Sequence, residues 1–227
     1  MEMQSLDVNT IGCLSYVIKY PAICADKYPA IIYLHGAGTR GTNIGKLMNH
    51  SFFGTSHFGN ADTPFILFAP LCSKNSWFDI FEQLQAFVRM VAAHPNVDAN
   101  RLFLMGSSMG GYGTWQLAMT MPEYFAAIVP ICGGGMKWNA ERLVHVPVWA
   151  FHGADDSTVP VQESILMVDA VKKAGGTARL TILENTGHNS WDYAFSTKEL
   201  FAWLLAQTRT CESVSSDSKY TDSKLFG

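Results

Sequence analysis

One serine of this sequence has the neighbours that a nucleophile needs. Ser108 lies within the stretch Gly106–Gly110, which has the form G-x-S-x-G; an apolar run, Leu102–Met105, precedes it, and a helix-like segment, Gly111–Met121, follows. At a tight strand-to-helix turn, small residues two positions before and after the nucleophile let strand and helix approach without a clash. Ser107 has no glycines at those offsets. The pattern predicts that Ser108 attacks a carbonyl carbon, and a serine that caps a helix is the alternative.

A serine hydroxyl needs an imidazole to take its proton, and the imidazole needs an acid to orient it. After a turn of this kind the chain order is serine, acid, histidine. The seven histidines are His35, His50, His57, His94, His145, His152 and His188. Four precede Ser108, and His145 and His152 precede or adjoin the acidic candidates, so His188 is the predicted base. We interpret His35 as structural, hydrogen-bonding its own loop into shape.

Two adjacent aspartates leave the acid ambiguous on spacing alone. Asp155 suits either the catalytic role, for which it is the second choice, or a residue that shapes a turn. Asp156 suits either the catalytic role or a cap on the following helix. Asp169 is a third option, although it falls inside a predicted helix.

The oxyanion formed by such an attack needs two backbone N–H donors. We expect one from Met109, at a helix N-terminus, and the other from Ala37 in the loop His35–Gly38, for which an ordinary turn is the alternative. Three tryptophans, Trp77, Trp138 and Trp191, are candidates to line the substrate pocket, and buried packing is an equal alternative for each. No metal or cofactor is expected, because His152 has no second ligand at a metal-like spacing.

The elements that must position these residues follow from the apolar pattern. Buried-strand runs occur at 30–34, 65–69, 102–105, 126–131 and 146–151, with strands also expected at 14–20, near a sheet edge, and 178–183. Helices are expected at 79–93, 111–121, 161–174 and within 191–207. This alternation predicts an α/β fold with a mostly parallel central sheet and helices on both faces. The loops after Leu34, Met105 and Phe151 would meet at the carboxyl ends of the strands, where such sheets bind ligands.

Length and composition limit the classes of function. With 227 residues, 48% of them hydrophobic, the chain suits one domain, residues 1–209, with a polar tail, 210–227, predicted to be disordered. The segment 133–145 is too short for a large cap. A net charge of −3, with no basic stripe or phosphate-binding loop, argues against nucleic acid.

The sequence also bears on the cell compartment. No apolar run has membrane-spanning length, and Met1–Thr10 lacks a signal-peptide pattern, so we expect a cytoplasmic protein, with export by a leader left open. Five cysteines without a C-x-x-C pair indicate reduced thiols. Nothing in the sequence indicates an oligomeric state.

Five motifs in order resemble the α/β-hydrolase superfamily. Within it, the chain is similar to capless serine carboxylesterases of the phospholipase/carboxylesterase (predicted peptidase, dienelactone-hydrolase-like) subgroup. The motifs are Leu34–Gly41, Gly106–Trp115, Pro130–Gly135, His152–Pro160 and Gly187–Trp191. The family aspartate precedes Val-Pro with two residues between them, which implies that Asp156 is the acid. Related dienelactone hydrolases use a cysteine nucleophile, whereas this chain has Ser108.

The resemblance implies a serine carboxylesterase that works through an acyl-serine intermediate. Its substrate would be a small-molecule or carbohydrate-linked ester, with acetyl or feruloyl groups as examples. A thioesterase or a serine peptidase on the same fold, and a non-catalytic binding protein, are the alternatives.

Overall fold

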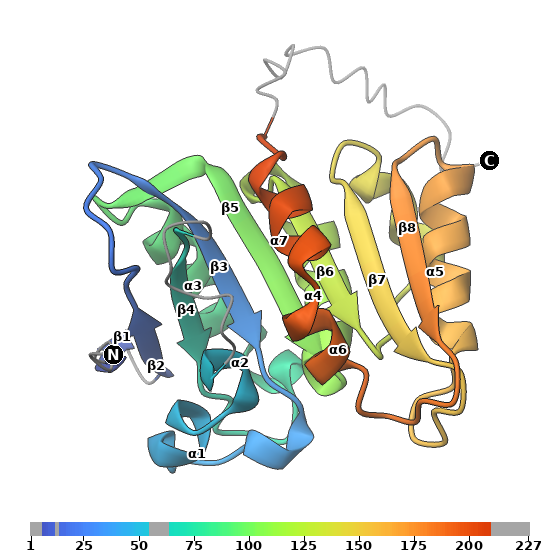
Figure 1. Ribbon diagram of the computed structural model, residues 1–227, viewed down its shortest axis with the longest axis horizontal. Helices are drawn as coiled ribbons and strands as arrows, with labels where there is room; N and C mark the ends of the chain where they lie inside the picture. Colours follow the sequence, from blue (N-terminus) through green and yellow to red (C-terminus); the bar gives the residue numbers. More distant parts are fainter. Residues whose placement is uncertain (1–5, 12–13, 55–63, 210–227) are drawn as a thin grey trace, which may run out of the picture.

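The computed structural model describes residues 6–11, 14–54 and 64–209; the predicted tail, 210–227, lies outside them. Eight strands form one sheet in the order β1-β2-β4-β3-β5-β6-β7-β8 (Figure 1). Their bounds are β1 Leu6–Ile11, β2 Leu14–Lys19, β3 Tyr28–Leu34, β4 Ile66–Pro70, β5 Val97–Ser107, β6 Ala127–Ile131, β7 Val148–Gly153 and β8 Ala178–Leu183. All pairs from β4 to β8 are parallel, which confirms the predicted mostly parallel α/β sheet.

The sheet begins with an antiparallel edge that the sequence analysis did not include. β1 forms a hairpin with β2, in register from Leu6 opposite Lys19 to Ile11 opposite Leu14, and β2 pairs antiparallel with β4. The strand expected near the sheet edge, at 14–20, is β2, and β1 lies outside it as the edge strand. The burial of β2 is consistent with this place, because Val17 is fully buried and Ile18 is nearly so.

Helices cover both faces of the sheet. The helices are α1 Ile44–Met48, α2 Ser51–Gly54, α3 Phe81–Ala92, α4 Met109–Thr120, α5 Gln162–Lys173, α6 Trp191–Ser196 and α7 Lys198–Leu205. In Figure 1, α6 and α7 lie in front of the sheet and α3, α4 and α5 behind it. Each layer buries its own apolar cluster; Phe87, Trp115 and Met167 belong to the rear one, and Phe52, Phe195 and Leu204 to the front one.

The last helical segment is divided in two. Thr197 has extended backbone angles (φ −81°, ψ 103°) and separates α6 from α7. Between β6 and β7 the chain forms a short 3-10 helix, Lys137–Leu143, and no large cap is present among the described residues.

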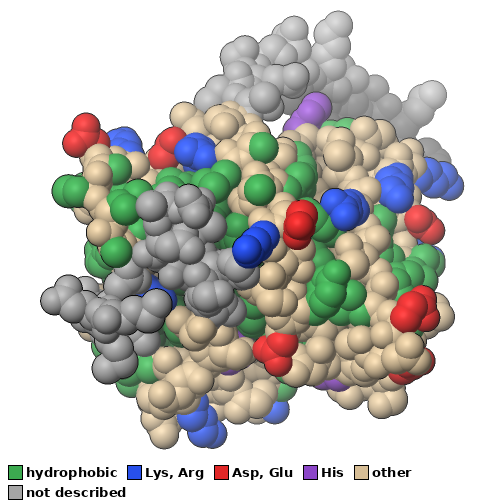
Figure 2. Space-filling model, viewed as in Figure 1, with side chains coloured by type: hydrophobic (Ala, Val, Ile, Leu, Met, Phe, Trp, Pro, Cys, Tyr) green, Lys and Arg blue, Asp and Glu red, His purple; other side chains and the backbone are tan. Residues whose placement is uncertain are grey.

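Acidic and basic side chains are interspersed over the visible part of the face in Figure 2. Within the described ranges, no helix has the length and apolar character to cross a bilayer.

Two glycines allow α4 to pack directly on the strand ends. A Cβ on Gly110 would lie 1.8 Å from the carbonyl oxygen of Leu34, and one on Gly106 would lie 2.3 Å from that of Gly110. Side chains of any size are excluded at both positions. The turn between β5 and α4 is thereby held against the end of β3, and this contact fixes where Ser108 lies.

Candidate active site

Ser108 lies at the tip of the turn between β5 and α4 in a conformation that few residues adopt. Its φ is 55° and its ψ is −118°, and its amide donates to the carbonyl of Ile131 at 2.9 Å. A non-glycine residue at positive φ is strained and persists only where its surroundings enforce it. The side chain makes no capping hydrogen bond to α4, so the alternative of a helix-capping serine does not apply.

His188 joins this serine to a carboxylate. It lies in the loop between β8 and α6, with Nε2 2.8 Å from the Ser108 hydroxyl and Nδ1 2.7 Å from Oδ2 of Asp156. Because a carboxylate only accepts, Nδ1 carries the hydrogen and Nε2 presents a lone pair to the hydroxyl. The ring of Trp191 packs edge-on against the imidazole, with centroids 5.5 Å apart. In this geometry a histidine could take the proton of a serine hydroxyl while a carboxylate orients its ring.

Asp156 is the buried member of this chain of hydrogen bonds. Its Oδ1 accepts from the amides of Thr158 and Val159, each at 2.9 Å, so the residue shapes a turn and does not cap a helix. Burial opposes ionisation, but the hydrogen bonds from His188, Val159 and Thr158 outweigh it and hold the pKa of Asp156 below its usual value. The carboxylate is therefore charged at neutral pH.

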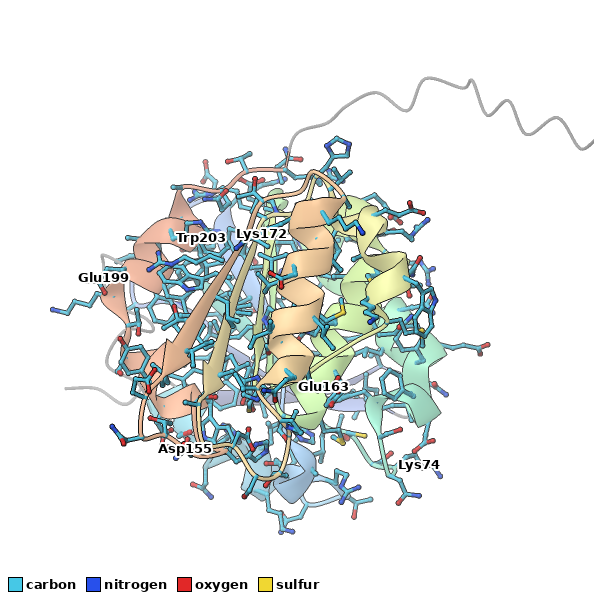
Figure 3. The ribbon with its side chains drawn as sticks, turned by 90° about the vertical axis from the view of Figure 1, so that its right-hand side faces the viewer. Lys74, Asp155, Glu163, Lys172, Glu199 and Trp203 are labelled. Carbon is cyan, nitrogen blue, oxygen red and sulfur yellow. The ribbon has the colours of Figure 1, made fainter. Side chains whose placement is uncertain are left out.

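The other two acidic candidates face solvent. Asp155 is exposed on the loop after β7, at the lower end of the molecule in Figure 3. Asp169 is exposed on α5. Among the contacts of the described residues neither side chain bonds the histidine, whereas Asp156 bonds it directly. The structure thus separates the adjacent aspartates, which spacing alone does not.

The loop after β3 lines the same site. The amide of Cys72 donates to Nε2 of His35 at 3.0 Å, so the hydrogen of this neutral ring lies on Nδ1, which donates to the carbonyl of Gly36 at 2.7 Å. In a trans peptide the carbonyl and the following N–H point in opposite directions. His35 therefore fixes the plane of the Gly36–Ala37 peptide and the direction of the Ala37 N–H.

The two predicted oxyanion donors have no other hydrogen-bond partner within the part of the chain that the structure describes. Among the hydrogen bonds of the described residues, neither the amide of Ala37 nor that of Met109 has an acceptor. Ala37 lines the pocket, and Met109 begins α4, where the helix dipole favours negative charge. Both amides are available to bind an oxyanion.

A pocket of about 340 Å³ opens beside Ser108. Its lining residues are Gly36, Ala37, Gly38, Thr39, His50, Ser107, Ser108, Thr158, His188 and Trp191. Of the three candidate tryptophans only Trp191 belongs to it. Trp77 is fully buried and donates its indole N–H to the carbonyl of His35, and Trp138 is 76% exposed. His50 and Thr158 were not predicted to line it, because neither residue type marks a pocket in sequence.

A thiol also approaches the histidine. The ligand atoms of Cys132, Asp156 and His188 lie within 4.8 Å of one another, a spacing that would also suit a metal ion. Cys132 is fully buried, and burial raises the pKa of its thiol to about 12. A thiol that stays protonated at neutral pH is a poor nucleophile. Ser108, which lines the pocket and bonds His188, is the better placed of the two.

His35 should also make stability depend on pH. Burial lowers its pKa to about 4 from an ordinary 6.5. As pH falls from 6.5 to 4, the unfolded chain takes up a proton that the folded protein does not, so stability is present above 6.5 and is lost on acidification. We expect His35 to contribute about 3 kcal/mol to this loss. Urea unfolding at pH 7 and pH 4 measures it, and His35→Asn, which keeps a donor for Gly36, should flatten the dependence; an equal slope would contradict this account.

Comparison with known proteins places this site in a family. The model of the dienelactone hydrolase family matches residues 28–198, more than half of the chain. The chain belongs to the dienelactone hydrolase family. The matched range includes the turn at Ser108, the loop of Asp156 and His188, which are the three residues joined by hydrogen bonds in the site.

Individual relatives include esterases and a depolymerase. A thermostable esterase of known structure is 31% identical with a TM-score of 0.81, covering 91% of this chain and 63% of that one. A poly(3-hydroxyoctanoate) depolymerase from Pseudomonas fluorescens is 31% identical over 48% of this chain and 42% of its own length. The chain thus spans less than two thirds of both. A dienelactone hydrolase structure from Klebsiella pneumoniae, at 18% identity, TM-score 0.66 and coverage of 90% and 96%, shares the fold.

Proposed function

We propose that this member of the dienelactone hydrolase family hydrolyses carboxylic esters through an acyl-serine intermediate. The observation that carries the proposal is the unbroken chain from the Ser108 hydroxyl through His188 to the buried, charged Asp156, at 2.8 and 2.7 Å. These hydrogen bonds lie beside a pocket that Ala37 also lines, and the amide of Ala37 has no acceptor among the described residues. The esterase and depolymerase among its relatives act on ester bonds by name, which supports this class of substrate.

The geometry supports a two-step reaction. His188 Nε2 takes the proton of Ser108 as its oxygen attacks the ester carbonyl, and the Ala37 and Met109 amides bind the resulting oxyanion. The tetrahedral intermediate then collapses, and His188 passes the proton to the departing alcohol. Water, deprotonated by His188, attacks the acyl-serine, the same amides bind the second oxyanion, and the acid leaves with Ser108 reprotonated. Asp156 keeps Nδ1 protonated and stabilises the imidazolium in both steps.

A peptidase is the second candidate, because acylaminoacyl peptidases share the fold at 15% identity. A match at that identity shows only the fold, and this chain covers 43% of that protein. Esters have a better leaving group than amides, and a pocket that no large cap covers among the described residues favours small or carrier-bound esters. Comparing kcat/KM on p-nitrophenyl acetate, longer acyl esters, an acyl thioester and a peptide anilide separates esterase, thioesterase and peptidase.

Labelling with a fluorophosphonate tests the nucleophile directly. We expect stoichiometric modification of Ser108 in folded protein at pH 7, located by peptide mass spectrometry, because only an activated hydroxyl reacts with this probe. Iodoacetamide, in contrast, should leave Cys132 unmodified and the hydrolysis rate unchanged, since that thiol is buried and protonated. If the fluorophosphonate left Ser108 unmodified and iodoacetamide modified Cys132 with loss of activity, the chain would use a cysteine mechanism.

A further inference from the structure

A second histidine meets the carboxylate of Asp156. His152, in β7, is fully buried, and its Nε2 lies 3.2 Å from Oδ2 of Asp156, the same oxygen that accepts from His188. The same Nε2 is 2.9 Å from the carbonyl of Val159. On the other side of the ring, Nδ1 is 2.7 Å from the hydroxyl of Ser164.

These partners fix the hydrogen on His152. Nε2 faces a carbonyl oxygen and a carboxylate oxygen, and neither can donate, so Nε2 carries the hydrogen in any proton state of the ring. The hydroxyl of Ser164 can donate to Nδ1 or to the carbonyl of Gly133, 3.0 Å away. Burial lowers the pKa of His152, against opposing contributions from the carbonyl of Val159 and from Asp156. At neutral pH the ring is a neutral donor from Nε2.

We propose that His152 is a positioning residue for the reaction: its Nε2–H donates to the carbonyl of Val159 and lies 3.2 Å from Oδ2 of Asp156, and so holds the carboxylate and the turn that carries it. This deepens the proposed function and rests on it. Oδ1 is anchored by the amides of Thr158 and Val159, but without His152 the other oxygen is held by His188 alone. A carboxylate anchored at one oxygen can swing about that anchor, and a misplacement of about 1 Å can cost about 10²-fold in rate.

The ring also ties the turn together. Val159 donates its amide to Oδ1 of Asp156 and accepts the Nε2–H of His152 through its carbonyl. His152, Val159 and Asp156 therefore form a closed loop of contacts. The next residue, Gly153, brings β7 against the loop of His188, because a Cβ there would lie 2.1 Å from the carbonyl oxygen of Gly187. The end of β7 thus sets the position of both the acid and the base.

Two amide substitutions separate this role from simple packing. The amide nitrogen of glutamine reaches the position of Nε2, whereas that of asparagine reaches only the position of Nδ1. We expect His152→Asn to lower kcat about 10- to 100-fold with KM changed less than about threefold, because alignment for the chemical step is lost and binding is not. His152→Gln should recover kcat to within about threefold of the parent.

Ser164→Ala is the matched control, since it removes the hydrogen bond at the other side of the same ring and leaves Nε2 in place. We expect it to lower the melting temperature while kcat stays within about threefold. Rates on p-nitrophenyl acetate are corrected for the folded fraction measured by circular dichroism. Equal kcat for His152→Gln and His152→Asn, or a loss in Ser164→Ala as large as in His152→Asn, would overturn the proposal. Fluorophosphonate labelling of Ser108 in the parent tests the proposed function separately, so either idea can fail alone.

Discussion

Replacing Ser108 with alanine is expected to lower kcat for ester hydrolysis by about 10⁶-fold while leaving the folded structure intact. The hydroxyl is the only group lost, and the side chain that it bonds is His188. The parent serine already places a Cβ at φ 55°, so alanine adds no backbone strain. Initial rates on p-nitrophenyl acetate, together with melting curves, check both parts of this expectation.

Cys132→Ala provides the control, because the thiol approaches the same histidine from the end of β6. If Ser108 is the nucleophile, this variant keeps most of the parent rate. A Ser108→Ala protein with more than about a thousandth of the parent kcat would contradict the serine mechanism, since the remaining groups alone give only a small residual rate. Loss of activity in Cys132→Ala instead would transfer the role to the thiol.

The sheet could be predicted from sequence because its central strands are buried on both faces. Runs such as Ile66–Pro70 and Ala127–Ile131 are fully buried, and only apolar side chains fit there. The hairpin of β1 and β2 was incomplete in the prediction, because β1 lies at the edge and edge strands lack such a run. The break at Thr197 was also missed, since the apolar spacing continues across it from α6 into α7.

Part of the candidate site could also be predicted from the sequence, for a different reason. Chain order and glycine offsets select Ser108 and His188, because the turn geometry restricts which residues fit. Adjacent aspartates differ only in the direction of their side chains, so the choice of Asp156 came from the family resemblance. Contacts that depend on three-dimensional packing gave no signal. The role we propose for His152 is an example, although its position before a glycine at a strand end parallels that of His35.

Asp156→Asn should be the second most damaging change, costing about 10⁴-fold in kcat. Its amide can donate as well as accept, so Nδ1 of His188 can lose its hydrogen to Nε2, and the ring then presents an N–H to Ser108 where a lone pair is needed. The amides of Thr158 and Val159 still bind the remaining carbonyl oxygen, so the turn should keep its shape. The loss therefore falls on the chemical step, visible in kcat with KM nearly unchanged.

Asp155→Asn is the matched control, with the same chemical change one residue away on an exposed side chain. We expect it to retain most of the parent rate, because within the described residues it is the Asp156 carboxylate, not that of Asp155, that bonds His188. The comparison is sharp because both variants remove one negative charge from the same loop, so a general electrostatic effect would lower both rates alike. A larger loss in Asp155→Asn would mean that the loop rearranges when substrate binds and that the exposed aspartate replaces the buried one beside His188.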